Sequence, residues 1–353
     1  MSLLMVENEP KFQRLASEVY ERQFRLEFYR DEILTAANKE HIYQGTRFCI
    51  TYLHTAYALE EPKIFEEYAR WVYHLLCPLK QDKTKTQIYH MLLGHFQSIR
   101  DAMETLMSEE EKQKLNCLLG RAGDALGEEY GAENCTMPGE HMEYEDKVER
   151  YLGFLKKSDT KGAVSFILEC INGGIPLTNV YVDIIAEAMR RVGELWHQHQ
   201  ITVDTEHYCT SVTQLAISQM YPIVFGQERS VSHKVLVACA GSELHELGAR
   251  MIADLFEYQG WDSVYLGAAV PIDALLAAVG EQRPSLVALS VTMPQHLMAC
   301  REMAEAIHRK YPGVKIAVGG NAFKSTNEIW KNWSVDVYTC DARELVDWAE
   351  HTL

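Results

Sequence analysis

The chain has 353 residues, 47% of them hydrophobic, which is enough for two or three globular domains with sizeable cores. Its net charge of −16 at pH 7 would repel a phosphate backbone, so binding to nucleic acid is not expected. The sequence contains no apolar run of about eighteen residues that could span a membrane, and its start turns acidic at once, unlike a signal peptide.

Residues 1–135 are predicted to form a helical domain. Apolar residues recur at helical spacing in this part, and the expected helices are 8–37, 39–59, 62–77, 85–106 and 109–130. Pro62 suits a helix start, Pro78 separates the third helix from the fourth, and Ser108 with Glu111 forms a capping box before the fifth. Residues 136–143 have the composition of a linker.

The helices of this first domain are rich in aromatic side chains. The aromatic residues are Phe24, Phe28, Tyr29, Tyr43, Phe48, Tyr52, Tyr57, Phe65, Tyr68, Trp71, Tyr73, Tyr89 and Phe96, and the histidines among them are His41, His54, His74, His90 and His95. A well-packed bundle accounts for them as well as a pocket for a large flat ligand, such as a linear tetrapyrrole or haem, would. No cysteine marks an attachment point. Candidate contacts for such a ligand are Arg47, Tyr52, His54 and Trp71.

Residues 144–228 are predicted to form a four-helix bundle. Apolar residues have helical spacing from Val180 to Trp196 and from Val212 to Ile223, and the segment 202–205 supplies capping residues between these helices. Polar and aromatic residues gather at that junction. Trp196-His197 is followed by Glu206-His207, with nine residues between Trp196 and Glu206.

Residues 229–353 are predicted to form a flavodoxin-like (Rossmann-like) domain with a parallel sheet. Three predicted strands end at polar or glycine-rich elements, which are 243–248 (Glu-Leu-His-Glu-Leu-Gly), 290–292 (Ser-Val-Thr) and 319–320 (Gly-Gly). Forty-one residues separate the first element from the second, and twenty-six separate the second from the third. Ligands of open α/β sheets bind at this carboxyl edge of the strands.

The three elements resemble the signature of the cobalamin-binding domain shared by methionine synthase, corrinoid methyl carriers and some mutases. That signature reads Asp-x-His-x-x-Gly, then Ser-x-Leu or Thr, then Gly-Gly. The resemblance implies that His245 replaces dimethylbenzimidazole as the lower ligand of cobalt (base-off, His-on) and that Glu243 holds its other ring nitrogen. Ser290 and Thr292 would line the slot for the displaced nucleotide tail, Gly319 and Gly320 would let the tail pass close to the backbone, and Gly248 is a further cofactor-binding position.

The residue types suit this role. Neutral imidazole is a good metal ligand, and a neighbouring carboxylate fixes its tautomer and raises its basicity. Glu243 stands where the family usually has aspartate, a replacement that is common in its light-sensing members and unusual in methyl carriers. The alternative is a flavodoxin-like domain with an incidental loop histidine.

The upstream helices resemble the cap of the adenosylcobalamin photoreceptors that repress carotenoid synthesis. The spacing of Trp196 and Glu206-His207 implies that the tryptophan packs on the adenosyl group and that the Glu-His pair contacts it. His197 stands where that family has a histidine that binds cobalt after light removes the adenosyl group. The alternative is a bundle tryptophan beside a solvated polar turn. Those photoreceptors also carry a basic helix-turn-helix, which we do not find in this acidic sequence.

A helical domain followed by a photoreceptor-type cobalamin domain is also the plan of the photocobilins, which bind biliverdin beside cobalamin. This resemblance is one of architecture and implies a globin-like first domain. The fold class expected for the whole chain is therefore α and α/β.

Together these features predict a cytoplasmic light sensor rather than an enzyme. The expected cofactors are adenosylcobalamin and biliverdin, and the expected output is a light-dependent change of a homo-oligomer that acts on an unknown protein partner. The nine scattered cysteines fit free thiols in a reducing cytosol. The alternatives are a corrinoid methyl carrier of a methyltransferase system and a light-blind cobalamin or redox sensor.

Overall fold

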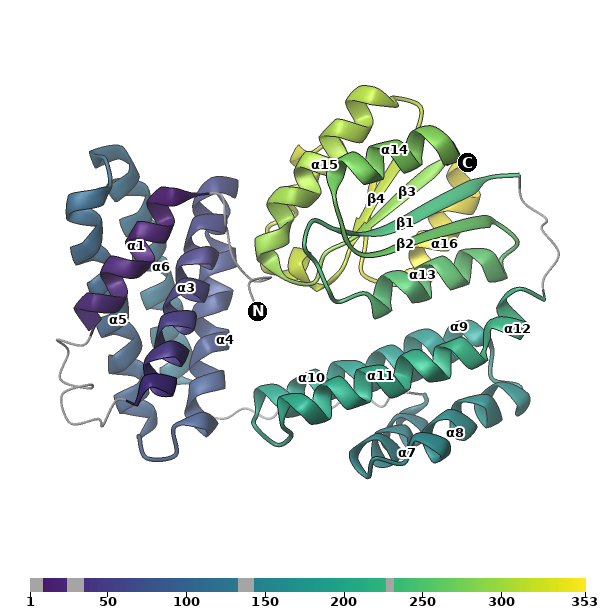
Figure 1. The fold of residues 1–353 in the computed structure, drawn as a ribbon, viewed down its shortest axis with the longest axis horizontal. Coiled ribbons are helices and arrows are strands. Elements are labelled where there is room, and N and C mark those ends of the chain that lie inside the picture. The colour runs from purple at the N-terminus through teal and green to yellow at the C-terminus, as the bar shows by residue number, and fades with distance from the viewer. Residues whose placement is uncertain (1–8, 24–34, 133–142, 227–231) are drawn as a thin grey trace. The chain divides into compact units, whose positions relative to one another are not determined.

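The computed structural model describes residues 9–23, 35–132, 143–226 and 232–353 (Figure 1). The chain forms two compact units. One consists of Met1–Thr136 with Met293–Met298 and Ala322–Ile329, and the other of Met137–Thr292, Ala299–Asn321 and Trp330–Leu353. Within the described ranges, no helix is both long enough and apolar enough to cross a membrane.

The first unit is built from long helices. They are α1 (Pro10–Gln23), α3 (Ala36–Leu59), α4 (Lys63–Leu79), α5 (Lys85–Leu106) and α6 (Glu109–Gly131). The prediction of one helix over 8–37 is wrong at its end, because Thr35 is extended and its side chain accepts from the Asn38 N–H at 3.2 Å. Thr35 thus caps the start of α3. The middle of the predicted helix, with Phe24, Phe28 and Tyr29, lies outside the described residues.

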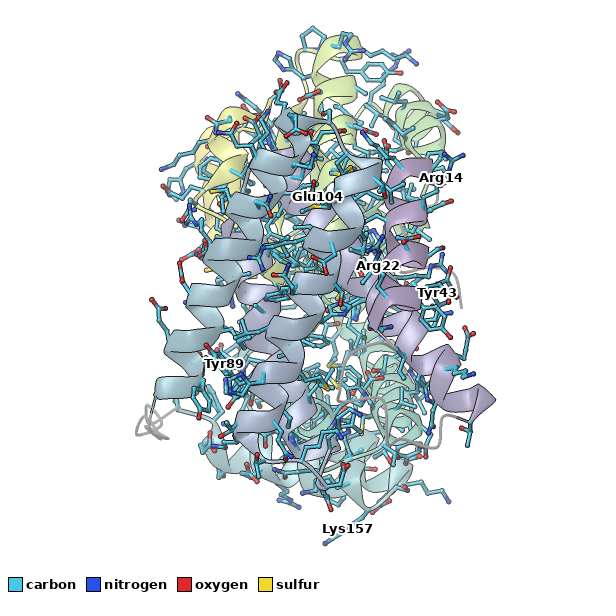
Figure 2. The ribbon with its side chains drawn as sticks, turned by 90° about the vertical axis from the view of Figure 1, so that its left-hand side faces the viewer. Arg14, Arg22, Tyr43, Tyr89, Glu104 and Lys157 are labelled. Carbon is cyan, nitrogen blue, oxygen red and sulfur yellow. The ribbon has the colours of Figure 1, made fainter. Side chains whose placement is uncertain are left out.

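The ends of the other helices follow local sequence signals. Capping boxes at Thr84 and Ser108 start α5 and α6, and the second confirms the prediction. Pro78 lies inside the last turn of α4 instead of beyond it. A proline removes one backbone N–H and blocks the preceding turn, and α4 ends one residue later. Figure 2 shows the side chains of this unit, among them Tyr43 of α3, whose ring lies 5.1 Å from that of Tyr20.

The second unit begins with a bundle that we call the cap. Its helices are α7 (Glu145–Lys156), α8 (Thr160–Asn172), α9 (Leu177–Asn179), the π-helix η1 (Val180–Ala186), α10 (Glu187–His197), α11 (Val203–Gln219) and α12 (Tyr221–Val224). The helix predicted over 180–196 is therefore π-helical in its first part. Thr202 precedes α11, but its hydroxyl bonds Thr205 Oγ1 at 3.0 Å rather than a backbone N–H, so the predicted side-chain cap is wrong.

The cap is followed by a five-stranded parallel sheet of order β2-β1-β3-β4-β5. The strands are β1 (Lys234–Ala240), β2 (Asp262–Val270), β3 (Leu286–Ser290), β4 (Lys315–Gly319) and β5 (Val337–Thr339). The helices are α13 (Leu247–Tyr258), α14 (Ile272–Gln282), α15 (Leu297–Lys310) and α16 (Ala342–Thr352), with 3₁₀ turns η2 (Pro294–His296), η3 (Asn321–Ser325) and η4 (Ile329–Asn332). The fold class is α and α/β, as predicted.

The strand order fixes where a ligand site can form. Helices α13 and α16 contact each other and lie on one face of the sheet, with α14 and α15 on the other (Figure 1). Strand β2 pairs with one side of β1 and strand β3 with the other, so the order of the strands reverses between β1 and β3. The residues of β1 and β3 are almost entirely buried. This reversal leaves a crevice beyond the carboxyl ends of β1 and β3, where the first two predicted elements lie.

We expect Gly320→Ala to destabilise the sheet domain by roughly 2–3 kcal/mol. Gly320 has a φ of +102°, and a Cβ there would lie 2.2 Å from the carbonyl oxygen of Val291. Urea unfolding would measure the loss. The control is Gly153→Ala in α7, where nothing lies within 4 Å of the added Cβ, and a gain of about 0.5–1 kcal/mol is expected. Equal effects at both positions would contradict the steric argument.

Candidate functional site at the carboxyl edge of the sheet

The site is organised by the fully buried carboxylate of Glu243. Its Oε1 accepts the backbone N–H groups of Leu244 and His245, both at 3.0 Å, and the His245 Nδ1–H at 2.6 Å. Its Oε2 accepts the Thr292 N–H at 2.9 Å. One carboxylate therefore holds both the loop after β1 and the loop after β3, which are 49 residues apart in sequence.

His245 is positioned as a metal ligand would be. Its Nδ1 faces the carboxylate, which can only accept, so the proton lies on Nδ1 and the lone pair on Nε2. The hydrogen bond to Glu243 raises the pKa of His245, and burial opposes that rise. The side chain remains 57% exposed, so Nε2 is open to a bound group. An accessible imidazole whose orientation a carboxylate holds fits the donor that cobalt requires.

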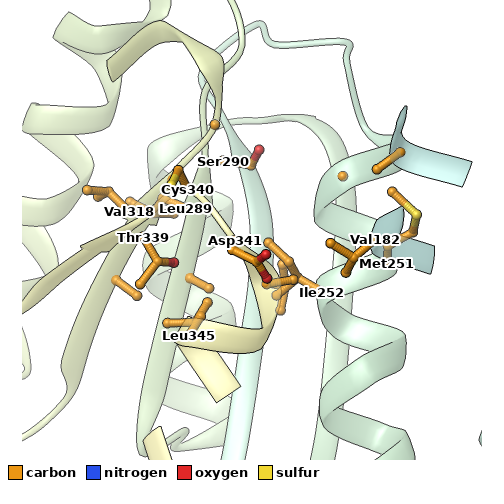
Figure 3. Close-up of a pocket in the computed structure, with 18 of the residues that line it drawn as sticks. Val182, Met251, Ile252, Leu289, Ser290, Val318, Thr339, Cys340, Asp341 and Leu345 are labelled. Atoms are coloured by element: carbon orange, nitrogen blue, oxygen red, sulfur yellow. The ribbon is translucent and has the colours of Figure 1, made fainter. Parts of the chain in front are cut away.

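A cavity of about 200 Å³ lies behind the loops, bounded by the sheet, α13, α16 and the π-helix of the cap. Apolar side chains such as Val182, Met251, Ile252 and Leu345 form much of its wall (Figure 3). Five of the predicted cofactor-binding residues line it, namely Gly248, Ser290, Thr292, Gly319 and Gly320. The second and third sequence elements therefore converge on one cavity next to His245.

The three glycines act in different ways. A Cβ on Gly248 would meet nothing within 4 Å, so this glycine keeps the cavity open. A Cβ on Gly319 would lie 3.0 Å from the carbonyl oxygen of Thr339, and one on Gly320 would overlap Val291. At Gly319 and Gly320 the close approach is therefore to the protein's own backbone. Besides the predicted passage of the ligand close to the backbone, this steric constraint is an additional reason for glycine at both positions.

On the cap side, Glu206 is the residue most clearly connected to His245. After the hydrogen bond to Glu243, the negative charge of Glu206 makes a smaller contribution to the raised pKa of His245. Glu206 also accepts from Thr210 Oγ1 at 3.0 Å and lies 3.1 Å from Nδ1 of His207, whose side chain is 67% exposed. The predicted Glu-His pair is therefore a bonded pair in the first turns of α11.

Trp196 and His197 form the last turn of α10, and both are half-buried. After His197 the chain turns through His199, whose φ of +55° lies in the left-handed region. The backbone N–H of His199 donates to the carbonyl oxygen of Trp196 at 2.9 Å. This turn connects α10 to α11, so that Trp196 and Glu206 flank one short connection.

The sequence analysis missed a set of polar residues on α13. Glu246, Arg250 and Asp254 are spaced by four residues, and each is bonded to a side chain of the cap. Their spacing was visible in the sequence, but their cap partners are far away in sequence and carried no signal. Thr339, Cys340 and Asp341, which also line the cavity, were missed as well because the strand that Thr339 ends has only three residues.

The candidate ligand contacts of the first unit are partly packed against one another. The ring of Tyr52 lies 4.7 Å from that of Tyr68, which in turn lies 6.3 Å from Trp71. The ring of His54 lies 4.4 Å from that of Phe12 at an interplanar angle of 58°. Burial lowers the pKa of His54, and among the described residues its Nδ1 has no hydrogen-bond partner. Arg47 lies over the ring of Tyr43 at 5.6 Å.

Comparison with known proteins identifies the second unit. Residues 233–344 match the B12 binding domain, and residues 148–221 match a second family model, also described as a B12 binding domain. Over 177 residues the chain is 27% identical to the HTH-type transcriptional repressor CarH of Myxococcus xanthus, a match that covers 50% of this chain and 58% of the repressor. This chain thus matches little more than half the length of that relative.

The fold is also similar to that of the monomethylamine corrinoid protein of Methanosarcina barkeri. The two structures superpose with a TM-score of 0.53 at 14% identity, over 60% of this chain and 100% of the corrinoid protein. Over residues 148–221 and 233–344, more than half of its length, the chain therefore belongs to the B12-binding family.

Proposed function

We propose that this B12-binding protein is a light sensor that takes adenosylcobalamin in base-off, His-on form. The observation that carries the proposal is the Glu243–His245 pair at 2.6 Å beside the cavity lined by Ser290 and Gly248. A ligand nitrogen and a slot next to it are the two features that binding through a histidine requires. The identity to the CarH repressor supports the photoreceptor branch.

Each residue of the lower side would have a distinct task. His245 would bind cobalt through Nε2, and Glu243 would keep the proton on Nδ1 and stop the ring from turning. The cavity would receive the nucleotide tail, with the hydroxyls of Ser290 and Thr292 at its polar end and aliphatic side chains around the rest. Because Glu243 also holds the Thr292 N–H, the ligand loop and the slot are fixed to each other.

On the upper side, Trp196 would cover the adenosyl group, and Glu206 and His207 would contact it. An indole face provides a large flat contact, and a carboxylate accepts hydrogen bonds from ribose or adenine. When bound, adenosylcobalamin supplies a cobalt–carbon bond that light can break. His197, next to Trp196, would then serve as the upper cobalt ligand.

The output we propose is a change in quaternary structure that an unknown protein partner reads. Biliverdin in the helical unit would be the second chromophore, and the buried His54 and the aromatic cluster of Tyr52 and Trp71 are candidate neighbours. We propose no DNA contact for this chain, whose net charge is −16.

The second candidate is a corrinoid methyl carrier, and the fold shared with the methanogen corrinoid protein favours it. A methyl carrier needs an upper face that partner enzymes can reach. Trp196 and Glu206 at the junction of α10 and α11 favour the light sensor instead, because they would close that face.

The proposal is tested by absorption spectra of the protein supplied in the dark with adenosylcobalamin and biliverdin, before and after green light. The light sensor predicts bound cobalamin that photoconverts to a stable product, together with a red band. Bound cobalamin without a stable photoproduct would favour the methyl carrier.

His245→Ala should remove the lower ligand while leaving the cavity intact. We expect weaker cobalamin binding, by about ten-fold or more, and a spectrum typical of a water or benzimidazole ligand. His233→Ala, which alters a histidine before β1, is the control. An unchanged spectrum in His245→Ala would show that another residue ligates cobalt.

Acidification should release His245 from cobalt. A proton on Nε2 blocks the lone pair, and cobalt competes with that proton, so ligation should be lost only after the pH has fallen below the raised pKa of His245. In cofactor-free Glu243→Gln protein, an NMR titration should give a lower His245 pKa than in the wild type. An equal or higher pKa would contradict the role of Glu243.

Trp196→Ala should spare the lower ligation and weaken the selection of adenosylcobalamin over methylcobalamin by roughly ten-fold. Competition binding in the dark measures that selectivity. A variant that keeps full selectivity would mean that Trp196 does not cover the adenosyl group.

A further inference from the structure

Glu246, which directly precedes α13, and Arg250 and Asp254 within the helix are three ionisable side chains at four-residue spacing. Residues separated by four positions lie above one another on a helix, so the three form a stripe. The stripe begins next to His245, the candidate cobalt ligand. It is thus anchored at one end in the loop that forms the lower side of the site.

Every member of the stripe is bonded to a different element of the cap. Gln214 of α11 donates to Glu246 Oε1 at 2.9 Å. Arg250 Nη1 donates to the hydroxyl of Tyr221, in α12, at 2.9 Å. The hydroxyl of Tyr181, in η1, donates to Asp254 Oδ2 at 2.9 Å. We call these three bonds the polar seam.

The seam is also tied to the sheet. The second carboxylate oxygen of Glu246 accepts from the Tyr265 hydroxyl of β2 at 3.0 Å, and Arg250 lies over the ring of Tyr265 at 5.1 Å. Glu246 therefore bridges the cap, the ligand loop and an edge strand. By contrast the exposed ion pair between Arg343 and Asp183 is worth little, because water screens it.

Because part of the seam is buried, its hydrogen bonds depend on the position of the cap. Tyr181 is fully buried and Asp254 is 7% exposed, so the tyrosine hydroxyl replaces water at that carboxylate. Burial raises the pKa of Asp254 to about 6, the Tyr181 bond and the charge of Arg250 partly oppose this rise, and Glu257 adds to it. If the cap moved away, three polar groups would lose their partners.

We propose that the polar seam positions the cap over His245, with Tyr181 and Tyr221 as positioning residues for the bound cofactor. This inference rests on the proposed function for the identity of the cofactor. Each bond joins a charged group to a neutral one, and water can satisfy both groups when the bond opens. Buried apolar side chains of the cap and of the sheet domain form one core around these bonds, and the seam adds directional contacts that fix how the cap lies on α13.

The test uses the full-length chain with the double substitution Tyr181→Phe and Tyr221→Phe, which deletes two hydroxyls and keeps both rings. The matched control is Tyr151→Phe. Tyr151 is also fully buried, but its hydroxyl bonds Thr213 within the cap at 3.1 Å and does not reach α13. Circular dichroism should first show that both variants fold.

The first readout is hydrogen exchange of the protein without cofactor. The double variant should exchange backbone amides of η1 and α12 faster than the wild type, whereas the control should leave these two segments unchanged. The second readout is the dark dissociation rate of adenosylcobalamin. We expect it to rise on the order of ten-fold, or about 1.4 kcal/mol, in the double variant only.

Equal exchange and equal dissociation rates in the double variant and the control would overturn the proposal. If the double variant does not fold, Asp254→Asn and Asp254→Ala replace it. Asn keeps an acceptor for Tyr181 and should behave like the wild type, whereas Ala should show the fast exchange. Equal exchange in those two variants would also overturn the proposal. Failure of the wild type to bind adenosylcobalamin would refute the proposed function but leave the exchange result standing as a test of the seam.

Discussion

The site depends on one buried carboxylate. Glu243 is fully buried and is surrounded by N–H groups from its own loop, from the imidazole of His245 and from Thr292. These bonds compensate for the loss of water around the charge. The same bonds set the tautomer of the imidazole and fix the loop after β1 against the loop after β3. The extra methylene of glutamate, relative to the aspartate usual in the family, still permits all of these contacts.

The sheet domain and the cap of the second unit contribute different parts of the candidate site. The sheet domain supplies the candidate cobalt ligand and the cavity, while the cap supplies Trp196, Glu206 and the π-helix that closes one wall of the cavity. Cap and sheet meet along α13 through the polar seam and through buried apolar side chains that belong to one core.

Local patterns predicted the parts of the fold that local forces determine. The capping box at Ser108 and the polar elements after β1, β3 and β4 were all readable, because each depends on residues within a few positions of one another. The break at Thr35 was missed because helical periodicity continues through it. The Glu243–Thr292 bond and the cap partners of α13 could not be predicted, because they join residues that only the folded chain brings together.

The most direct test of the account is electron paramagnetic resonance of the protein loaded with cobalamin in its Co(II) state, with and without nitrogen-15-labelled histidine. The unpaired electron couples to the nitrogen of the lower ligand. We predict that the nitrogen splitting changes when histidine is labelled and that this change disappears in His245→Ala. A nitrogen splitting that does not change with the label would mean that benzimidazole occupies the lower position, and the absence of any nitrogen splitting would mean that water does. Either result would contradict ligation by His245.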